Sequence, residues 1–161
     1  MEIAIFLDFD GTTLPLHYEN FLKQMNIVSK GKSTGKDKYG YFFSPEVMDN
    51  IKVLVDKFDP DIIITSTWKN DLKLFGLQQM WRERGYAGRL YDITDSININ
   101  KRGLEIKKYL ENNKYEYDKY IIIDDMGKQY FEPEQIYNLV QCDPNFGFDK
   151  EKLKEAIKLL S

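Results

Sequence analysis

The sequence lacks the features that mark secreted and membrane-spanning proteins. It has a single cysteine, Cys142, which cannot form an internal disulfide and favours a reducing compartment. No apolar run approaches the ~20 residues that a bilayer-spanning helix needs. The first apolar run follows the acidic Glu2 rather than a basic region, which argues against a signal peptide. We therefore expect a cytoplasmic protein that makes no membrane contact.

The chain also lacks a strong excess of charge. Its formal net charge is -3, which argues weakly against a protein that holds nucleic acid by bulk electrostatics, although a local basic patch remains compatible with it. The 161 residues are 42% hydrophobic and 30% charged, as in globular proteins with a buried core. No repeat or linker divides the chain, so we expect one domain over residues 1–161.

Two carboxylates follow the first apolar run. Residues 3–7 are apolar, with β-branched and aromatic members, and predict a strand buried on both faces. On an extended backbone the side chains of Asp8 and Asp10 point the same way, and their repulsion calls for a cation or a proton. Mg²⁺ prefers such oxygen ligands. The plainer interpretation of Asp10-Gly11 is a polar turn after a strand.

Two later apolar runs end in the same manner. The predicted strand at 61–64, apolar after Asp61, ends at Thr65 and Ser66, and the run at 120–123 ends at Asp124 and Asp125. Helical patterns separate these runs, and this alternation predicts an α/β fold with a parallel sheet. The carboxyl ends of parallel strands meet at one edge, where ligands bind. We therefore expect all these polar residues to converge.

The helical patterns have clear apolar positions. Ser44 and Pro45 predict the start of a helix that runs to Phe58, and Asp149 caps a helix through Leu160. A third helix is expected at about 71–84 and a fourth at 103–111. In the third helix the predicted buried positions are Leu72, Phe75, Leu77, Met80 and Trp81. In the fourth they are Leu104, Ile106, Tyr109 and Leu110.

The segment at about 14–44 predicts a small lid or flap. Its middle, residues 29–38, is glycine-rich and basic, which is typical of a solvated loop. Tyr18, Phe21, Leu22 and Met25 lie at near-helical spacing before it, and residues 39–43 are rich in aromatics. A loop of this length beside a candidate active strand is usually functional or disordered.

The stretch from Asp8 to Leu14, Asp-Phe-Asp-Gly-Thr-Thr-Leu after a buried strand, resembles the first motif of the haloacid dehalogenase (HAD) superfamily of phosphohydrolases. Thr65, Lys101 and the Asp124-Asp125 pair follow in the order of the other three motifs. The resemblance implies a three-layer, Rossmann-like parallel sheet with a minimal cap at about 14–44. It also implies a Mg²⁺-dependent phosphatase that forms an aspartyl-phosphate.

The resemblance implies a role for each motif residue. Asp8 is the expected nucleophile and Asp10 the expected general acid and base. The expected metal ligands are Asp8, Asp10 through its backbone carbonyl, and Asp124 or Asp125.

The phosphate-binding roles fall to the second and third motifs. Thr65 is expected to bind the transferring phosphoryl group, although Ser66 or Thr67 could do so. Lys101 is expected to neutralise its charge, although Arg102 could substitute.

More narrowly, residues 65–69, 102–106 and 123–125 are similar to small single-domain HAD proteins, including those fused to RNA-repair enzymes. The expected partner is a phosphorylated substrate, either a small molecule or a nucleic-acid end, and no obligate protein partner is inferred. Two alternatives remain at this point. One is a non-catalytic phosphate-binding or protein-interaction module on the same fold, and the other a receiver-like phosphoacceptor domain, whose acids are arranged in a different order.

Overall fold

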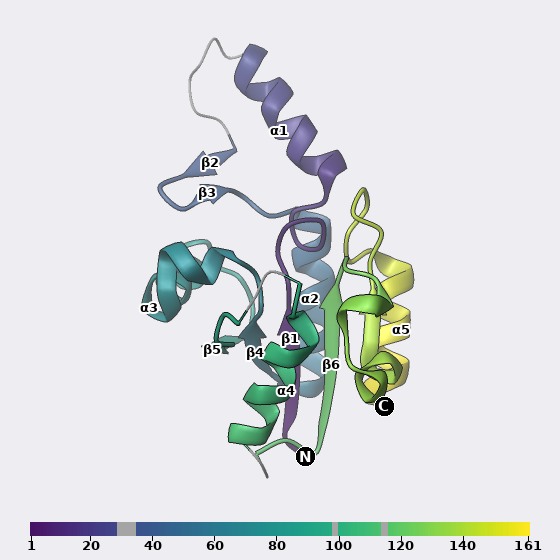
Figure 1. Cartoon of the computed structure of the whole chain (residues 1–161). Helices are drawn as coiled ribbons and strands as arrows, with labels where there is room; N and C mark the ends of the chain where they lie inside the picture. Colours follow the sequence, from purple (N-terminus) through teal and green to yellow (C-terminus); the bar gives the residue numbers. More distant parts are fainter. Residues whose placement is uncertain (29–34, 98–99, 114–115) are drawn as a thin grey trace.

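The computed structural model describes residues 1–28, 35–97, 100–113 and 116–161. A parallel sheet forms its centre, with helices on both faces, and a helix and a small hairpin stand above the sheet (Figure 1). Within the described residues the sheet has five strands in the order β5-β4-β1-β6-β7, all parallel. The predicted α/β class with a parallel sheet is therefore confirmed.

In chain order the elements are β1 (Ile3–Leu7), α1 (Leu16–Val28), β2 (Lys36–Asp37), β3 (Gly40–Tyr41), α2 (Pro45–Phe58), β4 (Asp61–Ile64), α3 (Trp68–Glu83), β5 (Arg89–Ile93), α4 (Arg102–Asn112), β6 (Lys119–Asp124), the 3₁₀ turns η1 (Lys128–Tyr130) and η2 (Pro133–Asn138), β7 (Leu139–Gln141) and α5 (Lys150–Leu160).

The strand register aligns the residues that carry the chemistry. Leu7 of β1 pairs with Ile64 of β4 on one side and with Ile123 of β6 on the other. The next residue on each strand is therefore Asp8, Thr65 or Asp124, so these three form one row across the centre of the sheet. Backbone hydrogen bonds continue into this row, from Asp8 N–H to the Ile123 carbonyl and from Thr65 N–H to the Leu7 carbonyl, each 3.0 Å long.

Two apolar cores hold the sheet from its two faces. Side chains alternate along a strand, so Ile5 of β1 enters the core under α2 and α5, and Phe6 enters the core under α4. Both faces of the central strands are thus buried, which explains why their sequences are continuously apolar.

The helices α2 and α5 begin where the sequence predicts, with Ser44 and Asp149 as their N-caps. Two predicted core positions are wrong. Phe75 of α3 is 71% exposed, because α3 is kinked at Lys73, whose φ of 59° and ψ of 176° are non-helical and shift the phase of the helix. Leu104 of α4 is also exposed, because that helix buries its polar residues Arg102 and Glu105 instead.

The segment between β1 and α2 contains α1 and the β2–β3 hairpin, which together we call the cap. Arg84, just after α3, fastens the hairpin. Its guanidinium donates to both carboxylate oxygens of Asp37, at 2.9 and 2.7 Å, and to the carbonyls of Gly40 and Tyr41, each at 3.0 Å. The near-helical spacing before the basic stretch is confirmed as α1, whereas residues 29–34 of that stretch lie outside the described residues.

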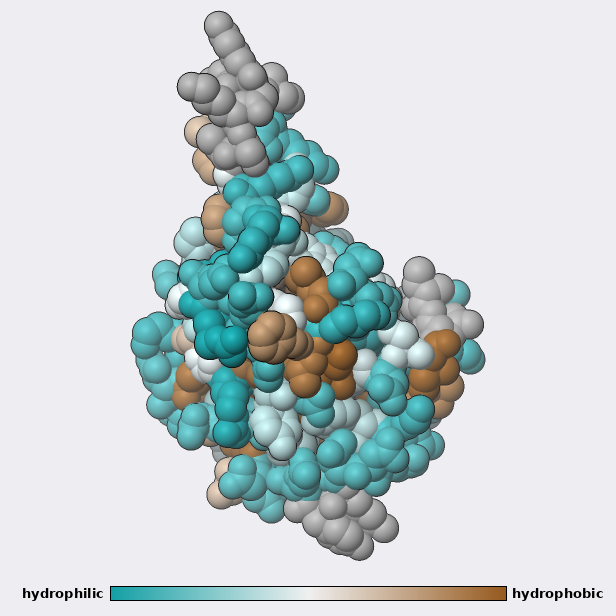
Figure 2. Space-filling view, turned by 90° about the vertical axis from the view of Figure 1, so that its left-hand side faces the viewer, coloured by the Kyte–Doolittle hydropathy of each residue, from teal (hydrophilic) through white to brown (hydrophobic). Residues whose placement is uncertain are grey.

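The face that α3 and the hairpin occupy is mainly hydrophilic, with apolar side chains gathered near its middle (Figure 2). Phe75 is the strongly exposed apolar residue that α3 contributes to the surface. Among the described helices, none is both long enough and apolar enough to cross a membrane.

We expect the Leu54→Ala variant to lose about 2–5 kcal/mol of unfolding free energy, because Leu54 of α2 is fully buried and its truncation leaves a cavity. Its neighbour Val53 is 43% exposed, so Val53→Ala should change stability by less than about 0.5 kcal/mol. Urea unfolding measures both. Equal losses in the two variants would contradict the assignment of this face of α2 to the core.

Candidate active site

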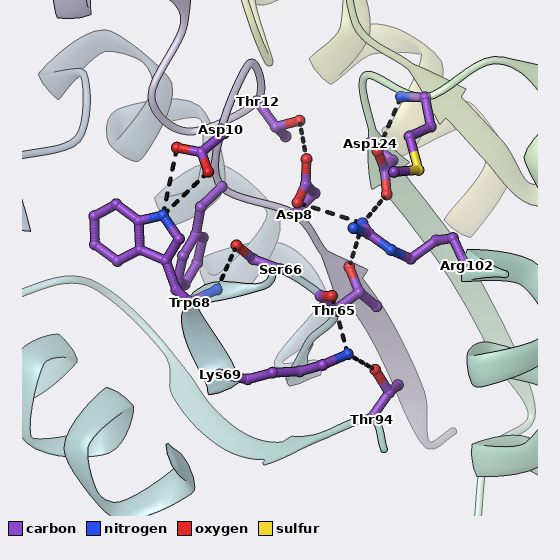
Figure 3. Close-up of polar contacts among 12 residues, drawn as sticks. Asp8, Asp10, Thr12, Thr65, Ser66, Trp68, Lys69, Thr94, Arg102 and Asp124 are labelled. Atoms are coloured by element: carbon purple, nitrogen blue, oxygen red, sulfur yellow. Dashed lines mark hydrogen bonds and ion pairs between the residues drawn. The ribbon is translucent and has the colours of Figure 1, made fainter. Parts of the chain in front are cut away.

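Asp8 lies at the centre of the row at the carboxyl edge of the sheet, and its side chain is buried. Arg102 Nη1 lies 3.3 Å from its Oδ1, and the Thr12 hydroxyl donates to its Oδ2 at 3.4 Å (Figure 3). Thr12 follows Gly11, whose φ of 76° allows the chain to turn sharply after the strand. Asp8 is thus a buried carboxylate held at both oxygens.

Two more carboxylates share this space. Asp8, Asp124 and Asp125 each place one carboxylate oxygen so that all three lie within 4.8 Å of one another. Burial first, and then the charge of Asp124, raises the pKa of Asp8 well above its ordinary value, against the opposing effect of Arg102. Burial likewise raises the pKa of Asp124 to about 6. When all three carboxyl groups are ionised, their negative charge exceeds the single positive charge of Arg102.

This donor set fits a magnesium ion. Mg²⁺ binds carboxylate oxygens at about 2.1 Å, so two of its ligands lie at most roughly 4.2 Å apart, and the three oxygens, all within 4.8 Å of one another, could close on one ion with small adjustments. A bound divalent cation would also favour the ionised form of the two buried carboxylates, against the effect of burial that raises their pKa values. Gly11 is required beside the site, because a Cβ there would collide with the Asp125 carboxylate. Asp8, Asp124 and Asp125 are therefore the side chains that could hold the metal.

Arg102 brings a cation into the site. Its Nη1 lies 2.5 Å from Asp124 Oδ2, and it donates to the Thr65 hydroxyl at 3.2 Å. Lys101, the sequence-predicted cation, occupies the N-cap position of α4 and is exposed. The arrangement brings Arg102 rather than Lys101 to Asp8, which corresponds to the alternative that the sequence left open.

Thr65 and Ser66 are both buried but face different partners. The Thr65 hydroxyl points to Arg102, whereas the Ser66 hydroxyl accepts a hydrogen bond from the backbone N–H of Trp68, 3.3 Å away, at the start of α3. Thr65 therefore borders the acidic cluster, and Ser66 supports the first turn of the helix.

Asp10 lies at the surface beyond Asp8. The indole N–H of Trp68 donates to both of its carboxylate oxygens, at 3.3 and 3.2 Å (Figure 3). Partial desolvation raises the pKa of Asp10, the Trp68 hydrogen bond opposes this, and the charges of Glu19 and Asp125 add to it. A carboxyl group with a raised pKa is suited to donating a proton near neutral pH.

A buried ion pair supports the site from behind. Lys69 Nζ donates to Glu105 Oε2 at 2.9 Å, to the Thr94 hydroxyl at 2.9 Å and to the Thr65 carbonyl at 3.1 Å. The other Glu105 oxygen accepts from the Ile97 N–H at 2.9 Å. Lys69 thus links α3, α4 and the end of β4 directly beneath Thr65.

Sequence reasoning missed the roles of Trp68, Lys69 and Glu105. A signal existed for α4, because Arg102, Glu105 and Tyr109 recur at the spacing of one helical face, and that face is the buried one. No comparable signal identified Trp68 or Lys69, whose partners lie far away in the sequence.

With this geometry in view, the comparison with known families is decisive. A family model described as "HAD domain in Swiss Army Knife RNA repair proteins" matches residues 4–153. The chain belongs to this HAD family. The match spans every strand of the central sheet except the first residue of β1, and it includes all four predicted motifs. No curated protein and no solved structure matches the chain.

The Lys69→Met variant of this HAD domain should be less stable by about 3–5 kcal/mol, because it leaves the Glu105 carboxylate buried without its counter-charge. The double variant Lys69→Met/Glu105→Leu should recover part of this loss, since no charge then remains buried. Chemical unfolding of the two variants measures the difference. A single variant as stable as the wild type, or a double variant less stable than the single one, would contradict this account.

Proposed function

We propose that this HAD domain is a Mg²⁺-dependent phosphatase that hydrolyses a phosphomonoester through an aspartyl-phosphate on Asp8. The observation that carries the proposal is the juxtaposition of three carboxylates, those of Asp8, Asp124 and Asp125, with the Arg102 guanidinium and the Thr65 hydroxyl. Family membership supports a hydrolase of the HAD type.

The metal would be held by Asp8, Asp124 and Asp125, with the Asp10 backbone carbonyl as a further ligand. When bound, Mg²⁺ supplies positive charge that offsets the repulsion between the Asp8 carboxylate and an incoming phosphate. Arg102 and the Thr65 hydroxyl bind the nonbridging phosphoryl oxygens, whose charge is shared over several atoms in the transition state.

In the first step an Asp8 oxygen attacks phosphorus and the bond to the leaving oxygen breaks. The Asp10 carboxyl gives its proton to that oxygen, so the product leaves as an alcohol. In the second step a water attacks phosphorus, the Asp10 carboxylate takes the proton of that water, and the bond between phosphorus and Asp8 breaks. Inorganic phosphate is released, and Asp8 is regenerated.

The class of substrate is a phosphomonoester, and two observations guide the choice of compounds to test. The matching family is described by its occurrence in RNA-repair proteins, which supports a phosphorylated nucleic-acid end. The cap consists of one helix and one short hairpin in the described residues, and so small a cap is suited to a large substrate. A panel should therefore contain 3′- and 5′-phosphorylated oligonucleotides beside nucleotides, sugar phosphates and phosphopeptides.

The purified protein should release phosphate from an aryl phosphate only with Mg²⁺, and Asp8→Asn should reduce kcat by at least about 10³-fold, because the amide cannot act as the nucleophile. The control is Asp49→Asn, the same chemical change on the exposed face of α2. Inactivity of the wild type across the whole panel would favour a phosphate-binding module, and stable labelling by acetyl phosphate without turnover would favour a receiver.

Mg²⁺ should stabilise the fold more at pH 7.5 than at pH 5. Asp8 and Asp124 have raised pKa values, about 6 for Asp124, so their contribution to stability is complete below about pH 4 and is lost as the pH rises past 6. Metal binding needs the ionised carboxylates. Mg²⁺ therefore restores the stability lost through ionisation at pH 7.5 and has less effect at pH 5. Thermal unfolding with and without Mg²⁺ measures the effect.

The matched variant for this experiment is Asp125→Asn, which should reduce the Mg²⁺-dependent increase in unfolding temperature at pH 7.5. An equal increase at the two pH values, or none at pH 7.5, would exclude a metal site built from these carboxylates.

A further inference from the structure

We propose that Trp68 is a positioning residue for Asp10, which it orients toward the leaving oxygen through the indole N–H. This inference rests on the proposed phosphatase chemistry, and it gives a role to a residue to which the resemblance assigned none. Trp68 need not touch the substrate, because it acts through Asp10.

Asp10 needs an external constraint. It follows the end of β1 and lies at the surface, where an aspartate side chain is free to change rotamer. Asp8, by contrast, is buried and held by Arg102 and Thr12. The Trp68 N–H lies within hydrogen-bond distance of both Asp10 oxygens, so it restrains the position of the carboxyl group and the direction in which it points. A proton donor acts efficiently only when it is held in line with its acceptor.

The Trp68 ring is itself fixed by the core. The rings of Phe9 and Phe43 pack against it, with centroids 5.5 and 5.4 Å away. The backbone N–H of Trp68 donates to Ser66, at the end of the strand that carries Thr65. The indole is therefore anchored to the same strand ends as the catalytic row.

Gly40 of the cap hairpin also lies close to the ring. A Cβ at Gly40 would lie 3.3 Å from Trp68 Cη2, so only a glycine leaves the hairpin this close without pressing on the indole. Arg84 holds the Gly40 carbonyl at 3.0 Å. Trp68 thus connects the fastened hairpin to the carboxyl group of Asp10.

The test is the Trp68→Phe variant, which keeps an aromatic ring against Phe9 and Phe43 and removes the N–H donor. We expect kcat/KM for phenyl phosphate to fall by about 10-fold, because its leaving oxygen needs a proton. The value for p-nitrophenyl phosphate should change much less, because its leaving group departs readily without one. A tryptophan with a structural role alone would affect the two similar substrates equally.

Two controls isolate the path through Asp10. In the Asp10→Asn background, Trp68→Phe should cause no further loss, since the group that it orients is already absent. Trp81→Phe is the matched substitution elsewhere in the core, because the Trp81 indole donates to the Ala87 carbonyl at 3.0 Å. That variant should leave the ratio of the two substrates unchanged.

An independent measurement uses the intact tryptophan. In ¹⁵N-labelled protein, Asp10→Ala should move one of the two indole N–H resonances upfield, because its acceptor is lost. The inference is overturned if neither resonance moves. It is also overturned if Trp68→Phe retains or exceeds wild-type activity on both aryl phosphates. The same holds if Trp68→Phe lowers the activity on both substrates equally and lowers it further in the Asp10→Asn background. By contrast, if Asp10→Ala moves the indole resonance but the wild type hydrolyses no phosphate ester, the phosphatase proposal itself is refuted and the contact between Trp68 and Asp10 stands.

Discussion

Repulsion among carboxylates is the constraint on which the rest of this structure depends. Three acids, Asp8, Asp124 and Asp125, share a small volume at the edge of the sheet, and two of them are buried. A fold can tolerate this only if the strands are held firmly and the charge is offset. The parallel register supplies the first condition, since hydrogen bonds on both sides of β1 fix the level at which each strand ends. Arg102 supplies part of the second.

Support for this cluster extends outward in layers. Arg102 stands on α4, and α4 is tied to α3 by the buried pair of Lys69 and Glu105. The same lysine holds the Thr65 carbonyl, so the strand that presents Thr65 and the helix that presents Arg102 are fixed by one ammonium group. Such a pair contributes little net stability compared with apolar packing, but it defines the relative position of the two elements. At this site, position is what the chemistry requires.

Much of the fold could be predicted from the sequence, because buried parallel strands are continuously apolar and their polar ends are abrupt. The runs before Asp8, Thr65 and Asp124 carried this signal, and the caps at Ser44 and Asp149 located two helices. Phe75 could not be predicted correctly, because periodicity assumes a regular helix and the backbone at Lys73 departs from one.

Within the site, local spacing was enough to single out candidate residues, whereas the long-range contacts left no signal in the sequence. Asp8 and Asp10 are two residues apart, and a short motif describes them fully. The contact of Trp68 with Asp10 spans 58 residues, and that of Lys69 with Glu105 spans 36. No local pattern encodes either contact. The choice between Lys101 and Arg102 depended on the rotation of α4, which becomes clear only when the helix is docked on the sheet.

The anchoring of the cap has a consequence for how this domain can diversify. One end of α1 is tied to the loop after β7, through N–H groups of Leu16 and His17 that donate to the Pro144 and Asn145 carbonyls. The hairpin is tied to Arg84 at the other end. Both attachments lie outside the row formed by Asp8, Thr65 and Asp124. The outer surface of α1 can therefore change its side chains without disturbing the acids, so the surface of the cap can vary while the acidic cluster stays the same.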